Sequence, residues 1–328
     1  MRVLVTGGAG YIGSTTAEAL LDAGHEVVVI DDLSRGHREL VPVRARFVHG
    51  GIDDPVALDA AMGEGVDACL HFAALMEAGE SMRKPEAYFA TNTGGSLRLL
   101  EHLTSAGVER FVLSSTAAVY GQPDQVPIEE SAPLRPTNAY GESKLLVERA
   151  LWWLADLRGL RVASLRYFNA CGATPGRGED HHPETHLIPL VLAAAAGRRE
   201  RIDVFGTDYP TRDGTCVRDY VHVADLADAH VAALHALGTQ ASIVCNLGSE
   251  TGFTVREVIA AVERVTGQQI PAVDAPRRPG DPAELVASRA RARDLLGWQP
   301  ARTDLDEIVA SAWDWHRSRW ETEASTPR

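Results

Sequence analysis

The sequence has few cysteines, and their spacing does not predict a disulfide framework. Its 328 residues contain four cysteines, which are scattered along the chain at Cys69, Cys171, Cys216 and Cys245. Disulfide-rich secreted domains and zinc ribbons need cysteines that are paired at short spacings. We therefore expect reduced cysteines and a cytoplasmic location.

Long hydrophobic runs and an excess of positive charge are also missing. No apolar stretch approaches the roughly 20 residues that span a bilayer, so no membrane helix is predicted. We expect no signal peptide, because the chain begins with MRVLVTG, a strand that leads at once into a glycine loop. The formal net charge of −13 argues against a nucleic-acid-binding surface, which has to be basic.

In the first half of the chain, short apolar runs alternate with segments of helical periodicity. Strands are predicted at Arg2–Thr6, Glu26–Ile30, Arg46–Val48, Ala68–Phe72, Arg110–Ser115 and Arg161–Phe168. Helices are predicted between them at Tyr11–Ala23, Val56–Met62, Pro85–Ala106 and Asn138–Arg158. This alternation indicates an α/β fold, a Rossmann-like doubly wound parallel sheet with helices on both faces.

The second half is less regular. Helices are predicted at Leu187–Gly197, Val223–Leu237, Val255–Thr266 and Leu305–Trp320, and a strand is predicted at Cys245–Leu247. We expect loops or irregular structure at Gly172–Pro183, Val204–Asp219 and Pro271–Pro282. The sequence therefore predicts a dinucleotide-binding domain over residues 1–170. A smaller mixed α/β substrate lobe over 171–320 would return some segments to the sheet, and 321–328 would be a frayed tail.

Glycines stand at 7, 10 and 13, directly after the first strand and at the start of the first helix. Glycine permits the tight turn and lets backbone N–H groups approach a pyrophosphate, which the helix N-terminus also favours. Asp31 ends the second strand, where its carboxylate can accept hydrogen bonds from a ribose and would repel the 2′-phosphate of NADP. The pattern favours NAD, and the alternative is a tight structural turn without a ligand.

The segment YGESK places Tyr140 four residues before Lys144 near the start of a helix, so both lie on one helix face. A phenol with a pKa of about 10 is a poor base at neutral pH, but a nearby ammonium and a cationic nicotinamide favour the phenolate. Tyr140 is therefore a candidate general base. A surface Tyr–Lys pair is the alternative interpretation.

Two further motifs end neighbouring strands of the predicted sheet. SSTAAVYG places the hydroxyls of Ser114, Ser115 and Thr116 beyond the fifth strand, and HFAA ends the fourth. Ligands of open parallel sheets bind beyond the carboxyl ends of the strands. Turn chemistry and core packing are the alternative explanations of these two motifs.

These motifs occur in one order together with LRYFNACGA, GTDYPTRDGTCVRDYVHVADLADAH, NLG and APRRPGD. In this combination the chain resembles the extended short-chain dehydrogenase/reductase family, and within it the UDP-glucose (UDP-galactose) 4-epimerases. The resemblance runs from about Arg2 to Trp298. The stretches 206–228 and 277–281 are its most specific parts.

The resemblance implies roles for individual residues. The catalytic group is expected to be Tyr140, Lys144, Thr116 and Ser115. The expected NAD contacts are Gly7, Gly10, Tyr11, Ile12, Gly13, Asp31, Asp32, Ser34, Gly36, Ile52, Phe72, Ala73, Ala74, Asn92, Ser114, Lys144 and Phe168. The expected UDP-sugar contacts are Thr116, Tyr140, Asn169, His186, Leu187, Val204, Phe205, Arg218, Arg278 and Asp281.

The chain departs from the pattern of the family at three places. Gly51-Ile52 stands where the family usually has an Asp before the residue that contacts adenine, and Asp53 or Asp54 is a possible substitute. Met76 replaces a lysine that many members have near the cofactor, which bears on how tightly NAD is retained. Leu285 lines the sugar pocket by resemblance and bears on the acceptance of N-acetylated sugars.

The histidines His181, His182 and His186 invite a metal interpretation, but their loop offers no firm ligand frame and the chemistry needs no metal. We therefore expect no metal. Trp152 and Trp153 fit either the core or a subunit contact. By resemblance, the family pairs its subunits through this helix and the one near Pro85–Ala106, so a homodimer is expected.

The predicted activity is the NAD-dependent interconversion of UDP-glucose and UDP-galactose. The related dehydratases carry an Asp-Glu pair directly after the Ser/Thr, where this chain has Ala117-Ala118. That difference argues against dehydration. A 4-epimerase of another UDP-sugar and a non-catalytic NAD-binding sensor are the alternatives.

Overall fold

The computed structural model describes residues 1–278 and 280–325, and its centre is a seven-stranded parallel sheet. The strands are β1 (Arg2–Thr6), β2 (Glu26–Asp31), β3 (Arg46–His49), β4 (Ala68–His71), β5 (Arg110–Thr116), β6 (Arg161–Tyr167) and β10 (Ser242–Leu247). Their spatial order is β10-β6-β5-β4-β1-β2-β3. The order reverses between β1 and β4, and such a switch point is where ligands bind in this class of sheet.

Apolar runs form these strands because both faces of the sheet are covered. In β1, for example, Val3 and Val5 pack into the core on one side, and Leu4 packs into the core on the other. All three side chains are fully buried. The predicted parallel sheet is confirmed.

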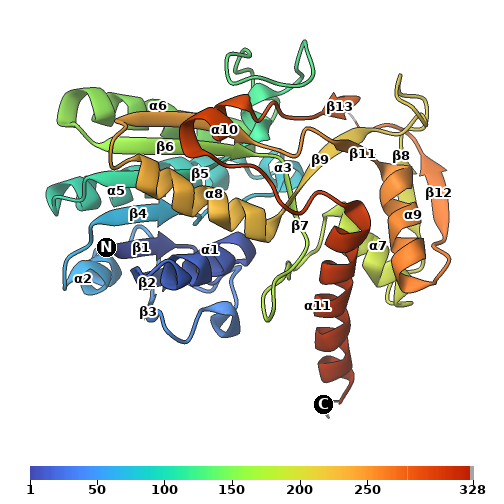
Figure 1. Ribbon diagram of the computed structural model, residues 1–328, viewed down its shortest axis with the longest axis horizontal. Helices are drawn as coiled ribbons and strands as arrows, with labels where there is room; N and C mark the ends of the chain where they lie inside the picture. Colours follow the sequence, from blue (N-terminus) through green and yellow to red (C-terminus); the bar gives the residue numbers. More distant parts are fainter. Residues whose placement is uncertain (279, 326–328) are drawn as a thin grey trace.

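Two layers of helices cover the sheet (Figure 1). On one face, α1 (Tyr11–Asp22) packs beside α8 (Val223–Ala236). The opposite face carries α2 (Pro55–Met62), α5 (Ser96–Ser105) and α6 (Ala139–Arg158), whose apolar residues share one core with β4 and β5. Short helices α3 (Ala78–Ser81) and α4 (Pro85–Tyr88) precede α5.

The segment predicted as one helix over Pro85–Ala106 contains a π-helical stretch, η2 (Phe89–Gly95), between α4 and α5. Gly95 lies there against Ile52, because a Cβ at this position would come within 3.0 Å of the Ile52 Cδ1 atom. Hydrophobic periodicity does not distinguish such a widened turn from an α-helix. Widened turns of this kind are frequent at functional sites.

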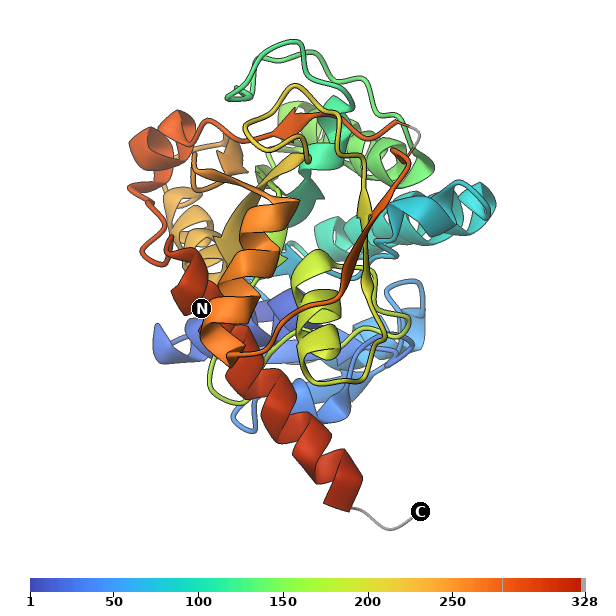
Figure 2. The same cartoon turned by 90° about the vertical axis from the view of Figure 1, so that its right-hand side faces the viewer.

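The second half of the chain forms a smaller lobe, which faces the viewer in Figure 2. A small sheet contains β7 (Asn169–Cys171), β9 (Val217–His222), β11 (Gly252–Thr254) and β13 (Glu284–Leu285), and a separate pair joins β8 (Ile202–Phe205) to β12 (Ala272–Ala275). Helices α7 (Leu187–Ala195), α9 (Val255–Thr266) and α11 (Leu305–Ser325) enclose the core of the lobe.

Several expectations for this half were wrong. The segment Val204–Asp219 contains the second half of β8 and the start of β9, and Pro271–Pro282 contains β12. Both strands are short, and β12 is mostly exposed, so a period-2 signal is weak over this length, although β8 alternates buried and half-buried residues. Helix α10 (Ala290–Leu296) was not predicted. Helix α11 continues to Ser325, so residues 321–325 of the predicted tail are helical, and 326–328 lie outside the described residues.

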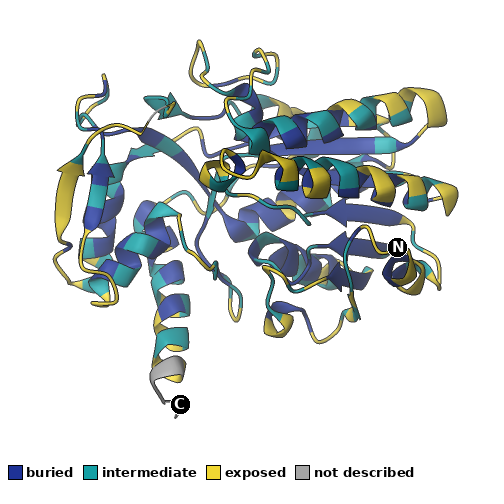
Figure 3. Cartoon of the chain, turned by 180° about the vertical axis from the view of Figure 1, so that it is seen from behind, coloured by how far each residue is buried: buried dark blue, intermediate teal, exposed yellow. Residues whose placement is uncertain are grey.

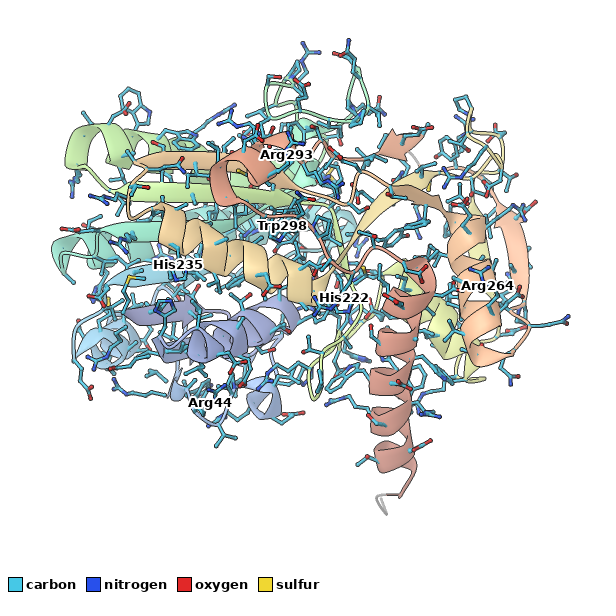
Figure 4. The ribbon with its side chains drawn as sticks, viewed as in Figure 1. Arg44, His222, His235, Arg264, Arg293 and Trp298 are labelled. Atoms are coloured by element: carbon cyan, nitrogen blue, oxygen red, sulfur yellow. The ribbon has the colours of Figure 1, made fainter. Side chains whose placement is uncertain are left out.

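Some segments of the second half lie on the large sheet. Strand β10 forms its edge beside β6, and α8 covers one face. The Trp298 indole N–H donates to the Asp225 carbonyl at 2.8 Å, which fixes the segment after α10 to α8 (Figure 4). Within the second lobe, His222 Nε2 at the end of β9 lies 3.2 Å from the Ser311 hydroxyl of α11. No helix among the described residues is long and apolar enough to cross a bilayer.

Candidate active site

The glycine loop after β1 lies against the end of β4. Gly7 has φ of +69°, and a Cβ there would meet the Ala73 backbone nitrogen at 2.5 Å. A Cβ on Gly13 would meet the Gly7 carbonyl oxygen at 2.3 Å. Neither position therefore has room for a side chain. The loop leads directly into α1 at Tyr11. This cradle and the N-terminus of α1 suit the pyrophosphate of a dinucleotide.

Asp31 holds the glycine loop in place. Its carboxylate accepts from the Ala9 and Leu33 backbone N–H groups, each at 2.9 Å. Burial raises the pKa of Asp31, and these two hydrogen bonds oppose that effect. Gly36 packs against Ala9, since a Cβ there would lie 2.8 Å from the Ala9 Cβ. The predicted ribose acceptor therefore also organises the pyrophosphate loop.

Asp32 lies at the surface beside Asp31, and its carboxylate accepts from the backbone and hydroxyl of Ser34 at 2.9 and 2.6 Å. Farther along this edge, Ile52 is buried in the core. Asp54 accepts from the first turn of α2 as its N-cap, whereas Asp53 is exposed and pairs with Arg98 at 3.3 Å. Of the two carboxylates considered as an adenine contact, Asp53 is the one that lies free of the helix cap.

Helix α6 brings Tyr140 to the end of β5. The Asn138 side chain caps the helix by accepting from the Gly141 N–H at 2.8 Å. Gly141 touches the turn η3 (Ala117–Tyr120), because a Cβ there would approach the Ala118 carbonyl oxygen to 2.6 Å. The Tyr140 phenol is hydrogen-bonded to the Thr116 side chain. Burial raises the pKa of Tyr140, and the hydrogen bond with Thr116 lowers it.

Lys144 lies one helical turn farther into the protein. It is buried, and its Nζ donates to the Ser114 carbonyl oxygen at 3.0 Å. Burial lowers the pKa of Lys144 to about 8, and the negative charge of Glu148 opposes the decrease. The Ser114 hydroxyl is hydrogen-bonded to the Tyr167 hydroxyl. Thr116, Tyr140, Lys144 and Ser114 therefore form one connected group at the carboxyl end of β5.

Ser115 points elsewhere, since successive residues of a strand face opposite sides. Its hydroxyl donates to Glu148, which is fully buried. Glu148 also accepts from Arg166 at 2.6 Å, and Arg166 in turn donates to the Tyr120 hydroxyl at 2.9 Å. This differs from the expectation that Ser115 belongs to the catalytic group: its side chain supports a buried ion pair behind that group.

The other expected cofactor residues surround the glycine loop and Tyr140. Phe72, Ala73 and Ala74 follow β4 and are half-buried. Asn92 of η2 is buried and bonds to both backbone groups of Leu75, and its amide also donates to the Ser143 hydroxyl at 3.0 Å. Asn92 therefore fixes the segment after β4 that leads to Met76. The Met76 side chain is exposed.

The expected UDP contacts come from the second lobe. Arg218 of β9 forms an ion pair with Asp281 at 3.1 Å. The Arg278 guanidinium lies over the Phe205 ring at 4.1 Å. His186 and Leu187 mark the start of α7, and the Asn169 amide donates to the Asp219 carbonyl at 2.9 Å. Val204 is buried in the core of the lobe, so a substrate contact there falls to its backbone.

Two of the apolar residues predicted at the site share one cluster. Phe168 and Leu285 both pack against the buried side chains of Val119, Tyr120, Ile128 and Leu145. Leu285 lies on β13, which pairs with Arg218 of β9. Leu285 therefore packs on the cluster beside the catalytic end of β5 and is also the strand partner of Arg218 in the second lobe.

Sequence reasoning missed Gly141, Glu148 and Arg166. Gly141 and Glu148 stand one and eight residues after Tyr140 on the same helix, and Arg166 lies in the strand that ends in LRYF. The available signal for Glu148 and Arg166 was a carboxylate and a guanidinium that each lie inside a mostly apolar segment. Charges that are buried in this way are normally paired with each other.

The arrangement as a whole combines a dinucleotide cradle, a half-buried tyrosine one helical turn before a buried lysine, and two arginines, Arg218 and Arg278, on the second lobe. A phenol held by Thr116 can exchange a proton with a substrate hydroxyl. The arginines suit a diphosphate, since guanidinium groups form charge-assisted bonds to phosphates.

Comparison with known proteins supports this interpretation. Residues 3–248 match the NAD dependent epimerase/dehydratase family. The chain is 51% identical over 322 residues to a UDP-glucose 4-epimerase of Lacticaseibacillus casei, with 97% of each chain covered. It is 54% identical over 319 residues to a UDP-glucose 4-epimerase of Streptomyces lividans, covering 97% of this chain and 96% of that one.

A solved structure is similar as well. The UDP-glucose 4-epimerase of Stenotrophomonas maltophila, crystallised with bound NAD and formylated UDP-arabinopyranose, superposes with a TM-score of 0.94 at 42% identity. The match covers 98% of this chain and 99% of that chain.

Proposed function

The chain belongs to the NAD dependent epimerase/dehydratase family, and from this premise we propose that it interconverts UDP-glucose and UDP-galactose with NAD as its cofactor. The observation that carries the proposal is the group of Thr116, Tyr140 and Lys144 at the carboxyl end of β5, beside the glycine cradle. Nearly full-length identity of about 50% to UDP-glucose 4-epimerases supports the same reaction.

The residues present fit NAD. Gly7 and Gly13 leave the space that a Cβ would fill, and Asp31 places a carboxylate at the end of β2. When bound, NAD accepts the hydride from C4 of the sugar and later returns it to the opposite face. The role of the protein is to bind and orient the partners and to manage one proton.

Tyr140 is the proposed base and acid. It takes the proton of the sugar 4-hydroxyl during oxidation and gives it back during reduction, so no net oxidation occurs. Burial alone raises the pKa of Tyr140, which disfavours the phenolate. The Thr116 hydrogen bond lowers the pKa of Tyr140, and the positive charge of a bound nicotinamide ring would also favour the phenolate.

Epimerisation also requires the 4-keto sugar to turn over while its nucleotide stays bound. We assign the anchor to the second lobe, where Arg218, Arg278 and Phe205 lie. Binding energy on the nucleotide, away from the reacting carbon, leaves the sugar free to rotate. Leu285 is proposed to line the sugar pocket and thereby to affect which hexose or N-acetylhexosamine is accepted.

Dehydration is disfavoured by the chain itself. The two residues after Thr116 are Ala117 and Ala118, and neither carries an acid or a base. The remaining alternatives are a 4-epimerase of another UDP-sugar and a non-catalytic NAD-binding sensor. A sensor is less consistent with the buried Tyr140–Thr116 and Lys144–Ser114 contacts.

We also propose that the protein is a homodimer that pairs through α5 and α6. Trp153 and Leu157 of α6 are 66% and 75% exposed, and Leu97 of α5 is 44% exposed. Trp152, in contrast, packs into the core. Figure 3 shows exposed residues along the outer faces of the helices on this side of the sheet. Light scattering during size exclusion would give twice the chain mass, and Trp153→Glu would reduce it to that of one chain.

A cytoplasmic location is proposed from the cysteines. Cys69, Cys171, Cys216 and Cys245 are all free and buried, which is typical of proteins from a reducing compartment. Cell fractionation tests this location.

The function is tested with purified protein, NAD and separate UDP-galactose, UDP-N-acetylgalactosamine and UDP-arabinose, with NMR of the products. We expect conversion of UDP-galactose to UDP-glucose. Tyr140→Phe should reduce kcat by about 100-fold to 10,000-fold, the usual contribution of general acid–base catalysis. Bound NAD without turnover of any of these sugars would instead support the sensor.

A further inference from the structure

Two histidines and two glutamates converge where the loop after β7 enters α7. The candidate ligand atoms of Glu179, His181, Glu184 and His186 all lie within 4.8 Å of one another. His186 Nδ1 is 2.7 Å from Glu179 Oε1 and 3.0 Å from Glu184 Oε1. His181 Nδ1 is 3.2 Å from Glu179 Oε1 and 3.9 Å from Glu184 Oε2.

These separations match the geometry of a metal site. Ligand atoms bound to zinc at about 2.0–2.1 Å in a tetrahedron lie about 3.3–3.4 Å from one another. The four measured separations, from 2.7 to 3.9 Å, lie on both sides of that value. Small side-chain adjustments would therefore place all four donors around one ion.

The cluster is incompletely satisfied by its own hydrogen bonds. His181 Nδ1 is buried and has no hydrogen-bond partner among the residues that the structure describes, although the Glu179 carboxylate lies beside it. The Glu179 side chain is only 6% exposed. A buried imidazole nitrogen without a bond is costly, and a metal ion at the centre would satisfy it.

The charge and the donor atoms of the cluster indicate which metal ions it would bind. Two carboxylates balance the charge of a divalent ion. Imidazole nitrogens suit zinc and similar transition metals, whereas magnesium and calcium prefer oxygen donors alone.

We propose that Glu179, His181, Glu184 and His186 form a structural site for a divalent transition-metal ion of the zinc class. Four protein ligands close the coordination sphere, as in structural rather than catalytic zinc sites. The expectation of no metal rested on the lack of a ligand frame in the sequence of this loop. The fold supplies the frame by bringing the loop back against its own exit into α7.

Surrounding contacts hold the donors in place, as an outer shell does in metal sites. Glu184 Oε1 accepts from the backbone N–H groups of Thr185 and His186 at 2.7 and 2.8 Å. The Glu179 carbonyl accepts from the Trp315 indole at 3.4 Å, and Asp180 pairs with Arg319 of α11. The contacts of Glu179 and Asp180 attach this part of the loop to α11.

The site would fasten a loop that reaches both lobes. His37, in the segment after the cofactor residues Asp31 and Asp32, lies 3.0 Å from the Asp180 carbonyl. Arg35 donates to the His182 carbonyl at 3.2 Å. A bound ion would thus order the loop between the segment that follows β2 and the start of α7, without taking part in proton or hydride transfer.

The test is metal binding by the full-length protein. Protein purified in chelator-treated buffer is titrated with zinc against a competing dye, and metal content is measured by mass spectrometry after dialysis. We expect one zinc per chain. His181→Ala and Glu184→Gln should each weaken zinc binding by more than about 100-fold, since even loss of an outer-shell partner costs roughly 10–100-fold. Magnesium should not compete.

The matched control is His182→Ala, which removes the adjacent exposed histidine from outside the cluster and should bind zinc as the unaltered protein does. Cobalt(II) should give the intense absorption bands of tetrahedral coordination in the unaltered protein and lose them in Glu184→Gln. Equal zinc affinity of the unaltered protein and both cluster variants would overturn the site, as would a metal content well below one. Circular dichroism verifies that each variant is folded. Because the two variants replace different ligands, the zinc affinity of one still tests the site if the other misfolds.

Discussion

Replacing Glu148 with Gln would test how the buried ion pair supports the catalytic group. Glu148 is fully buried and binds Arg166 through both carboxylate oxygens, at distances from 2.6 to 3.2 Å. It also accepts from Ser115, the neighbour of Thr116, and it lies one helical turn after Lys144. The change therefore leaves a buried guanidinium without its counter-charge.

The expected loss of stability is large. Removing one partner of a buried pair typically costs about 3–5 kcal/mol, because the remaining charge stays buried. For a chain of this size roughly 2 °C of Tm corresponds to 1 kcal/mol, so Tm should fall by about 6–10 °C. Glu142→Gln on the same helix is the matched control. Its side chain is 37% exposed and 3.9 Å from Arg149, so its effect should stay within about 0.5 kcal/mol.

A second consequence concerns pH. Burial lowers the pKa of Lys144 to about 8, and Glu148 is the group that opposes this decrease. Without the carboxylate, the pKa of Lys144 should fall further. The alkaline decline of epimerisation, which follows loss of the ammonium proton, should therefore begin at a lower pH than in the unaltered protein.

Urea unfolding followed by tryptophan fluorescence in saturating NAD gives the free energy, and a coupled assay for UDP-glucose gives the pH profile. Adding Arg166→Met to Glu148→Gln should restore part of the stability, since two absent charges cost less than one unpaired charge. If Glu148→Gln matched Glu142→Gln in both stability and pH profile, the reasoning about this pair would be refuted.

Three further predictions concern the cradle and the reacting group. Gly13→Ala should weaken NAD binding by roughly tenfold to 100-fold, about 1–3 kcal/mol, because the new Cβ would lie 2.3 Å from the Gly7 carbonyl oxygen; NAD titration with Gly79→Ala as control checks this. Thr116→Val should lower kcat about 10–100-fold and Thr116→Ser much less, since only the first removes the hydroxyl that binds Tyr140; equal rates would contradict the role of the hydroxyl. In the unaltered protein kcat should fall as the pH rises through about 8, where Lys144 loses its proton, and a rate that keeps rising to pH 10 would be inconsistent with that assignment.

The parallel sheet could be predicted because its strands carry strong local signals. Buried runs such as Arg2–Thr6 and Arg110–Thr116 are apolar, end in glycine or hydroxyl residues and alternate with helical periods. Their observed ends agree with the predictions within a residue or two, except that β10 begins at Ser242 and not at the predicted Cys245. Strands β8 and β12 lacked such signals. They pair across 70 residues of sequence, from Ile202 to Ala272, and no local pattern encodes that partnership.

The candidate site divides in the same way. Motifs of contiguous residues, such as YGESK and the glycine loop, place their members together on one helix or turn. The partners of Ser115 could not be predicted, because Glu148 and Arg166 lie on different elements and meet only when α6 packs on β6. The cluster around Glu179 is similar: the sequence shows its histidines, but only the fold of the loop brings them to the carboxylates.

The geometry also explains why one tyrosine can serve both directions of the proposed reaction. Tyr140 is fixed from the helix side by the Asn138 cap and the close approach of Gly141, and from the strand side by Thr116. None of these contacts depends on which face of the sugar is presented. The anchor in the second lobe is likewise remote from the reacting carbon. Tyr140 is fixed to the scaffold, and the substrate is held only at its nucleotide end. The sugar can therefore turn while the acid–base group stays in place.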